Sequence, residues 1–163
     1  MSIEFVKGNL LDSDCSYICH QVNCQGVMGA GVAKQISDKW PQVFVSYYEK
    51  CKVIADYKQP ARINLGNIQI VALYDDFFAT DNHQCVINMF AQEYYGNQGR
   101  FTSYDAFWEC LWNIYICCQK GSTIAFPKGI GCGLGGANWK IIYSMIEEVL
   151  GDEFKVKIYY LED

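Results

Sequence analysis

The sequence predicts an α/β protein, a three-layer α/β/α sandwich, from three observations. Segments typical of strands alternate with segments typical of helices along much of the chain. Two glycine-rich runs each follow a predicted buried strand and lead into a predicted helix. Hydrophobic residues make up 51% and charged residues 19% of the 163 residues, which suits a globular core and not a disordered chain. We therefore expect one domain over residues 1–163.

The first half of the chain predicts four strands and two helices. The segment "SYICHQV" predicts a buried strand that ends at Asn23, and the alternation of apolar and polar residues at 2–6 predicts an edge strand. Val32 and Ile36 have helical spacing, and Pro41 ends that helix and begins a second one. The expected elements here are strands at 2–6, 16–22, 67–74 and 85–91, helices at 31–40 and 41–51, and a loop at 75–84.

The second half continues the alternation. A loop over 92–102 precedes a helix whose cap we assign to Thr102 with Asp105. One stripe of this helix is apolar, and Gly121 lies just past its end. A further helix begins at Asn138, a good N-cap, and ends at Gly151. The apolar stripe consists of Phe107, Leu111, Ile114 and Cys118, and short strands are expected at 123–127 and 155–161.

Composition and charge exclude several classes of protein. No apolar run approaches the ~20 residues that span a bilayer, so we expect no membrane partner. The first residues lack the layout of a signal peptide, which predicts a cytoplasmic protein. The net charge is −5 without a cluster of lysine and arginine, which disfavours nucleic acid as the main partner. We expect a monomer that binds a small molecule.

The nine cysteines predict neither a disulfide framework nor a metal centre. Their number is odd, their spacing is irregular, and several lie within apolar runs, so we interpret them as reduced thiols of the core. No pair has the C-x-x-C spacing, and the two histidines, His20 and His83, lie far apart in the chain. We expect neither a metal nor a cofactor.

The two glycine-rich runs predict a site for an anion. They are "GVMGAGVA" at 26–33 and "GIGCGLGG" at 129–136, and together they hold eight of the fourteen glycines. Glycine lets a phosphate approach the backbone, and the start of a helix presents unpaired N–H groups with a partial positive charge. Two tight turns without a ligand would be the alternative. Neither run matches the P-loop pattern, and "GVMGAG" does not match G-x-G-x-x-G, so neither an NTPase nor a Rossmann dehydrogenase is supported.

The motifs that flank these runs resemble those of the macrodomain family, which binds ADP-ribose. The resemblance rests on "VKGNLL", "HQVNCQGVMGAGVAKQI", "PKGIGCGLGGANW" and "KIYYL", in this order and spacing. It looks closest to the branch of terminal ADP-ribose–protein glycohydrolase, the antitoxins that reverse DNA ADP-ribosylation and the fungal ADP-ribose-1″-phosphate phosphatase. It implies a mixed, mostly parallel six-stranded sheet between helices.

The resemblance also implies which residues bind the ligand. Asn9 and Leu10 would lie at the adenine end, where Asn9 can accept a hydrogen bond through its amide oxygen. Tyr159 would pack on adenine, although a strand tyrosine that faces the cover of the sheet is an open alternative. Asn23 would contact the distal ribose. The first diphosphate loop would comprise Gly29, Ala30, Gly31 and Val32, and the second Gly131, Cys132, Gly133 and Leu134.

The chain departs from the family pattern where the glycohydrolases carry their catalytic groups. These relatives have a lysine after the strand that corresponds to "CVINMFA", where this chain has Gln92. An amide can neither attack a sugar carbon nor form an amine adduct. The aspartate that follows "GCGL" in the glycohydrolase is replaced by Gly135. A route through lysine and an acid is therefore not expected.

Two other residues are candidates for acid–base catalysis. His20 lies three residues before Asn23, at a place where the fungal phosphatase is similar, and a histidine can activate water near neutral pH. Glu93 lies on the loop after the strand at 85–91. A structural histidine in a strand and a solvated glutamate are the alternatives.

Three functions follow from the resemblance and its departures. The first is hydrolysis of a small ADP-ribose derivative, with removal of phosphate from ADP-ribose-1″-phosphate as the leading reaction and the glycine-rich loops as the electrostatic clamp. The second is a module that binds ADP-ribose or a related nucleotide signal without chemistry. The third is removal of ADP-ribose from protein or nucleic acid, in which case a nucleic acid would be a partner only as the ADP-ribosylated substrate.

Overall fold

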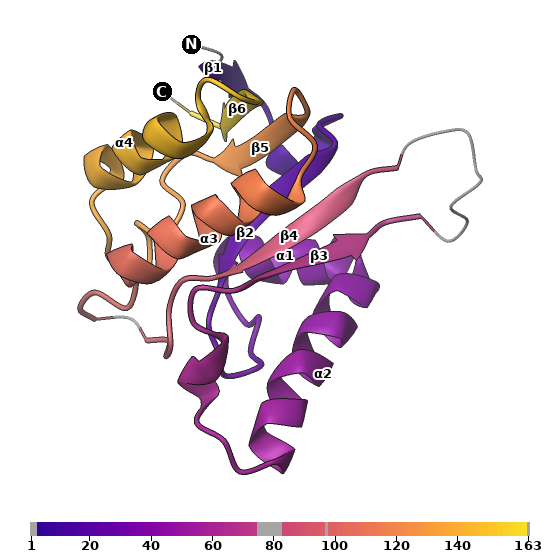
Figure 1. The fold of residues 1–163 in the computed structure, drawn as a ribbon, viewed down its shortest axis with the longest axis vertical. Helices are drawn as coiled ribbons and strands as arrows, with labels where there is room; N and C mark the ends of the chain where they lie inside the picture. The colour runs from indigo at the N-terminus through magenta and orange to yellow at the C-terminus, as the bar shows by residue number, and fades with distance from the viewer. Residues whose placement is uncertain (1–2, 75–82, 97, 163) are drawn as a thin grey trace.

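The fold is organised around one mixed β-sheet (Figure 1). The computed structural model describes residues 3–74, 83–96 and 98–162, and within them six strands have the order β1-β6-β5-β2-β4-β3. All neighbours are parallel except β3 and β4, which confirms the expected mixed, mostly parallel sheet. The strands are β1 (Ile3–Lys7), β2 (Tyr17–Val22), β3 (Ile68–Ala72), β4 (Cys85–Phe90), β5 (Thr123–Pro127) and β6 (Lys155–Tyr160).

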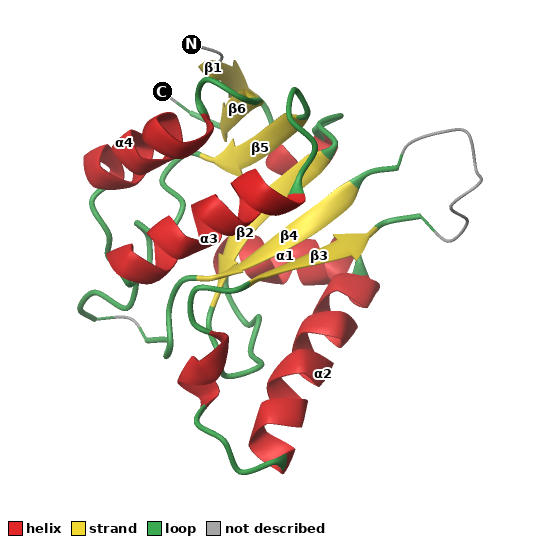
Figure 2. Cartoon of the chain, viewed as in Figure 1, coloured by secondary structure: helices red, strands yellow, loops and turns green. Residues whose placement is uncertain are grey.

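Helices cover both faces of the sheet, as Figure 2 shows. Ile36 of α1 and Tyr47 of α2 belong to the core on one face, whereas Leu111 of α3 and Ile146 of α4 belong to the core on the other. This arrangement confirms the predicted three-layer sandwich. The helices are α1 (Gly31–Lys39), α2 (Pro41–Asp56), α3 (Tyr104–Cys117) and α4 (Trp139–Leu150).

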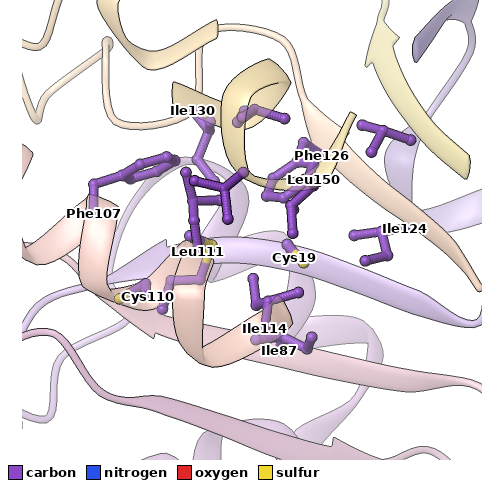
Figure 3. Packing of buried hydrophobic residues seen from close by; sticks show 14 of the residues in the cluster. Cys19, Ile87, Phe107, Cys110, Leu111, Ile114, Ile124, Phe126, Ile130 and Leu150 are labelled. Carbon is purple, nitrogen blue, oxygen red and sulfur yellow. The ribbon is translucent and has the colours of Figure 1, made fainter. Parts of the chain in front are cut away.

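The core under α3 and α4 is formed by the apolar stripe that the sequence predicts (Figure 3). Phe107, Leu111 and Ile114 have no solvent exposure, and Cys118 is 3% exposed. They pack with buried residues of β2, β4 and β5, among them Ile87 and Phe126. All nine cysteines are free thiols and six of them are buried, in agreement with their interpretation as core residues.

The predicted elements agree with the observed ones to within a few residues, apart from the longer α2 and one cap. The side chain that caps α3 is Ser103, whose hydroxyl accepts from the N–H of Ala106. Thr102 was the expected cap, and its hydroxyl instead donates to the carbonyl of Gly131 at 2.8 Å. Most of the loop predicted at 75–84 lies outside the described residues. None of the helices that the structure describes is long and apolar enough to cross a membrane.

Candidate functional site

Helix α1 begins without a side-chain cap. Its N-cap is Ala30, which has no side-chain acceptor, and no acidic residue lies in its first turn. By contrast, α3 and α4 are capped by Ser103 and Asn138, whose side-chain oxygens accept hydrogen bonds from backbone N–H groups. The first N–H groups of an α-helix have no partner within the helix and carry a partial positive charge. The start of α1 therefore presents backbone donors suited to an anion.

Two cavities lie on either side of the first turn of α1. Cavity A has a volume of about 470 Å³ and is lined by Ala30 and Ala33, and cavity B has about 490 Å³ and is lined by Val32. The second glycine-rich run borders both cavities, with Leu134 at cavity A and Gly129 at cavity B. The two glycine-rich runs therefore lie at one site, on either side of the start of α1.

Cavity B collects the residues expected at the adenine end. Asn9, Leu10 and Tyr159 all line it. The amide oxygen of Asn9 accepts from the N–H of Leu11 at 3.0 Å, so only its second lone pair remains for a ligand. Trp139 also lines this cavity, and the sequence analysis missed it. A cavity walled by these two aromatic rings suits a planar heterocycle.

Cavity A is uncharged along its lining. It is bordered by Asn23 and Gly29 of the first run, by Gln21 and Gln92 at its polar end, and by the half-exposed ring of Tyr95. No Asp, Glu, Lys, Arg or His is among the described residues that line it. A ligand in cavity A therefore meets amide groups, backbone and apolar carbon, and charge must be stabilised by backbone N–H groups.

The first glycine-rich loop is held from behind by a tyrosine. The hydroxyl of Tyr47 on α2 accepts from the N–H groups of Gly26 and Val27 at 3.0 and 3.1 Å. It also lies 2.7 Å from the side-chain oxygen of Asn23. Burial raises the pKa of Tyr47 well above its usual range, so the phenol keeps its proton. Its role could not be predicted, because an apolar helix position gives no signal of a contact with a loop twenty residues away.

The second glycine-rich loop is packed closely against the segment that follows β4. A Cβ at Gly135 would lie 2.5 Å from both the carbonyl oxygen of Gly131 and the hydroxyl of Thr102. The N–H groups of Phe101 and Thr102 donate to the carbonyl of Gly135 at 2.8 and 3.0 Å. Gly131, Cys132 and Gly133 lie on this loop between the ends that line the two cavities, and none of the three lines either one.

Gln92, at the position of the missing lysine, belongs to a polar cluster at the end of cavity A. Its amide oxygen accepts from Gln21 at 2.6 Å, and its amide nitrogen donates to the carbonyl of Tyr94 at 2.8 Å. The amide nitrogen of Gln21 also donates to the hydroxyl of Thr102 at 2.7 Å. The cluster joins β2, the loop after β4 and the second glycine-rich loop, so these three segments support one another at this end.

His20 lies in the interior of the sheet and lines neither cavity A nor cavity B. It is 1% exposed, and its Nε2 contacts the amide oxygen of Asn88, its register partner on β4. Asn88 donates in turn to Gln69 on β3 at 3.0 Å, and Gln69 donates to the carbonyl of Ser46 on α2 at 3.0 Å. Burial lowers the pKa of His20 to about 4, although the Asn88 contact opposes this shift.

The catalytic roles of His20 and Glu93 stay predictions. Neither residue lines cavity A or cavity B. The carbonyl of Glu93 accepts from the N–H of Cys24 at 3.1 Å and from the amide of Gln25 at 3.0 Å, so its backbone supports the start of the first loop. The geometry thus gives both residues structural contacts and no contact with a ligand site.

Comparison with known proteins identifies related chains. The family model described as "Macro domain" matches residues 19–146. A DNA ADP-ribosyl glycohydrolase of Mycobacterium tuberculosis is 26% identical over 85% of this chain, which spans only 36% of that relative's length. An ADP-ribose 1″-phosphate phosphatase of Saccharomyces cerevisiae is 25% identical over 93% of this chain and 94% of its own length.

A solved structure has a similar fold. The DarTG protein of Thermosipho africanus in complex with ADP-ribose superposes with a TM-score of 0.74 and 26% identity, over 96% of this chain and 41% of that one. At this identity and coverage the resemblance concerns the domain and not the whole relative. The activity of any larger protein is therefore a separate question from the architecture of this site.

Proposed function

This chain belongs to the macrodomain family, and we propose that it binds ADP-ribose derivatives across cavities A and B. One observation carries the proposal: the uncapped start of α1 lies between two cavities of similar volume. A ligand that matches this arrangement has an anion at its centre and a cyclic group at each end. ADP-ribose has a diphosphate between adenosine and ribose, and one relative of similar fold has a structure with ADP-ribose.

The orientation of the ligand follows from the lining of the two cavities. The aromatic walls of cavity B, Trp139 and Tyr159, suit adenine. Cavity A would take the distal ribose, with the amide of Asn23 near its hydroxyl groups. The diphosphate would lie at the start of α1, close to Ala30 and Gly31, with the second glycine-rich loop opposite. We also propose that residues 1–163 form one macrodomain, because β1 and β6 complete the sheet that contains the matched residues 19–146.

We place the chemistry at the distal ribose, in cavity A. Two relatives are named as hydrolases of bonds at ADP-ribose, and the phosphatase matches this chain over nearly its whole length. Removal of phosphate from ADP-ribose-1″-phosphate is therefore the first candidate. Water is the nucleophile: it attacks phosphorus, the bond between phosphorus and the ribose oxygen breaks, and a proton of the water passes to that oxygen. Because cavity A has no charged side chain among its described lining, backbone N–H groups stabilise the developing charge.

A second candidate is hydrolysis of the bond that joins ADP-ribose to a protein or a nucleic acid. The uncharged lining of cavity A favours it, because a phosphate dianion bound there would have no cationic partner, whereas a base or side chain joined to the ribose carries no such charge before the bond breaks. Incubation with ADP-ribose-1″-phosphate and with ADP-ribosylated DNA and protein separates the candidates. Phosphate release supports the first, free ADP-ribose supports the second, and neither product supports a module that binds without chemistry.

The binding proposal is tested at the start of α1. Ala30→Asp places a carboxylate where the diphosphate is expected and supplies the missing cap, whereas Ala30→Asn supplies a cap without the charge. We expect both variants to fold and the aspartate to weaken ADP-ribose binding by about tenfold more than the asparagine. Calorimetric titration with ADP-ribose, AMP and NAD measures this. Equal affinity of the two variants for ADP-ribose would show that the diphosphate does not bind at this position.

A further inference from the structure

The hydroxyl of Tyr47 is a buried junction between α2 and the first glycine-rich loop. The residue has no solvent exposure, and four nitrogen and oxygen atoms lie within hydrogen-bond distance of its oxygen. Two are the N–H groups of Gly26 and Val27, at 3.0 and 3.1 Å, which can only donate. The other two are the backbone and side-chain oxygens of Asn23, at 2.8 and 2.7 Å, which receive its single hydrogen. A phenol has two lone pairs and one hydrogen, so this environment uses all of its capacity.

This network also fixes which way the amide of Asn23 points. Its oxygen accepts from Tyr47 and from the N–H of Gln25 at 2.8 Å. Its nitrogen donates one hydrogen to the carbonyl of Val27 at 2.9 Å, which leaves the second hydrogen for another acceptor. Asn23 lines cavity A, so the remaining donor is available to a hydroxyl group of a ligand there. Without Tyr47 the amide would lose one of the two donors that hold its oxygen in place.

The ring of Tyr47 is held independently of its hydroxyl. Its centroid lies 5.7 Å from the ring of Phe90 and 6.3 Å from that of Phe44. A phenylalanine at this position would keep these contacts and lose only the hydrogen bonds. The loop that depends on the hydroxyl continues directly into Met28, Gly29 and Ala30, which line cavity A.

We propose that Tyr47 is a positioning residue, which holds the first glycine-rich loop and the donor of Asn23 in the geometry that binds the distal half of the ligand. This inference rests on the proposed function, in which cavity A takes the distal ribose and cavity B the adenosine. Tyr47 does not itself contact the ligand, since it is buried behind the loop. Its effect is therefore confined to ligands that extend beyond the start of α1 into cavity A.

The test compares Tyr47→Phe with Tyr48→Phe, which removes a hydroxyl from the adjacent, exposed tyrosine. We expect Tyr47→Phe to weaken ADP-ribose binding about tenfold, which corresponds to ~1.4 kcal/mol, and to change AMP binding less than about twofold. Tyr48→Phe should leave both affinities unchanged. If Tyr47 had a purely structural role, Tyr47→Phe would weaken the binding of both ligands to the same extent, and that outcome overturns the inference. Wild-type affinity of Tyr47→Phe for ADP-ribose also overturns it.

Amide hydrogen exchange tests the same inference without any ligand. The N–H groups of Gly26 and Val27 should exchange slowly in the wild-type protein and faster in Tyr47→Phe. Rapid exchange of both amides in the wild type overturns the inference, even if the variant does not fold. If the wild type fails to bind ADP-ribose, the proposed function is wrong, while the exchange rates still decide whether Tyr47 holds the loop.

Discussion

The two glycine-rich loops border the same site and are held in different ways. The first, at 26–33, depends on side chains that lie outside it, chiefly the hydroxyl of Tyr47 and the amide of Asn23. The second, at 129–136, is closed by its own backbone, with N–H groups of Cys132 and Gly136 donating to carbonyls of the same loop. Loops of similar glycine content therefore differ in their sensitivity to substitution. The first loop should be most sensitive to loss of the Tyr47 hydroxyl, and the second most sensitive to substitution of one of its glycines.

The largest effect is expected at Gly136 of the second loop. Its φ is +73°, and an added Cβ would lie 2.6 Å from the carbonyl oxygen of Gly99, a backbone atom that cannot move aside cheaply. Gly136→Ala should lower the free energy of unfolding by about 4 kcal/mol, from the strained backbone and the clash together. Gly133→Ala is the matched control, since nothing lies within 4 Å of its added Cβ. Denaturation in urea measures both, and equal stability of the two variants would contradict the close approach of the Gly99 carbonyl to this loop.

A second effect concerns the anchorage of the first loop in acid. The polar row from His20 through Asn88 and Gln69 ends at Ser46, next to Tyr47 on α2. Burial lowers the pKa of His20 from 6.5 to about 4, so below pH 6.5 the unfolded chain binds more protons than the folded one. The contribution of neutral His20 to the free energy of unfolding is complete above pH 6.5 and is lost as the pH falls toward 4. The loss amounts to about 3 kcal/mol at ~1.36 kcal/mol for each pKa unit.

His20→Gln should remove this part of the pH dependence. His83→Gln, at the exposed histidine, makes the same change of residue type on the surface and should leave the dependence in place. The free energy of unfolding, measured in urea from pH 4 to 8, checks both variants. An unchanged slope in His20→Gln would mean that the histidine titrates normally in the folded protein. That outcome would reopen its assignment as the general base.

The sequence alone predicts the strands and helices and the proximity of the two glycine-rich loops. Strand, glycine run and helix follow one another locally, and parallel strands bring their carboxyl ends to one edge of a sheet. The sequence does not predict the side chains that hold each loop in place, because their contacts join segments far apart in the chain. Tyr47 lies 21 residues from Gly26, and Thr102 lies 29 residues from Gly131. Their identity depends on helix packing and on loop approach, and neither leaves a periodic signal.

The same limit applies to His20 and to the cap of α3. Alternation in β2 indicates a buried strand, but Asn88 becomes the partner of His20 only through the register of β2 with β4. The choice between Thr102 and Ser103 as the cap is a shift of one residue, and both side chains are suitable. Thr102 is used elsewhere because the second loop approaches it closely. In both cases a tertiary contact, which the local pattern does not encode, decides the role of the side chain.

Thr102 provides a test of a side chain that supports the second loop. It is 2% exposed, donates to the carbonyl of Gly131 and accepts from Gln21. Thr102→Val should lower the free energy of unfolding by about 2 kcal/mol, because a buried carbonyl and a buried amide lose a partner. Thr102→Ser keeps the hydroxyl and should lose less than half as much. If valine and serine behave alike, the methyl group and not the hydroxyl supports the loop.

The smallest effect is expected at Gly29 of the first loop. An added Cβ would meet Val27 at 3.6 Å, an ordinary contact, and the φ of Gly29 is not positive. Gly29→Ala should therefore change the free energy of unfolding by less than about 0.5 kcal/mol, while Gly136→Ala changes it severalfold more. Sequence alone makes these two glycines equivalent, since each lies in a glycine-rich run before a helix. Urea denaturation of the two variants side by side distinguishes them, and a similar loss in both would mean that the first loop, too, is held by its glycines.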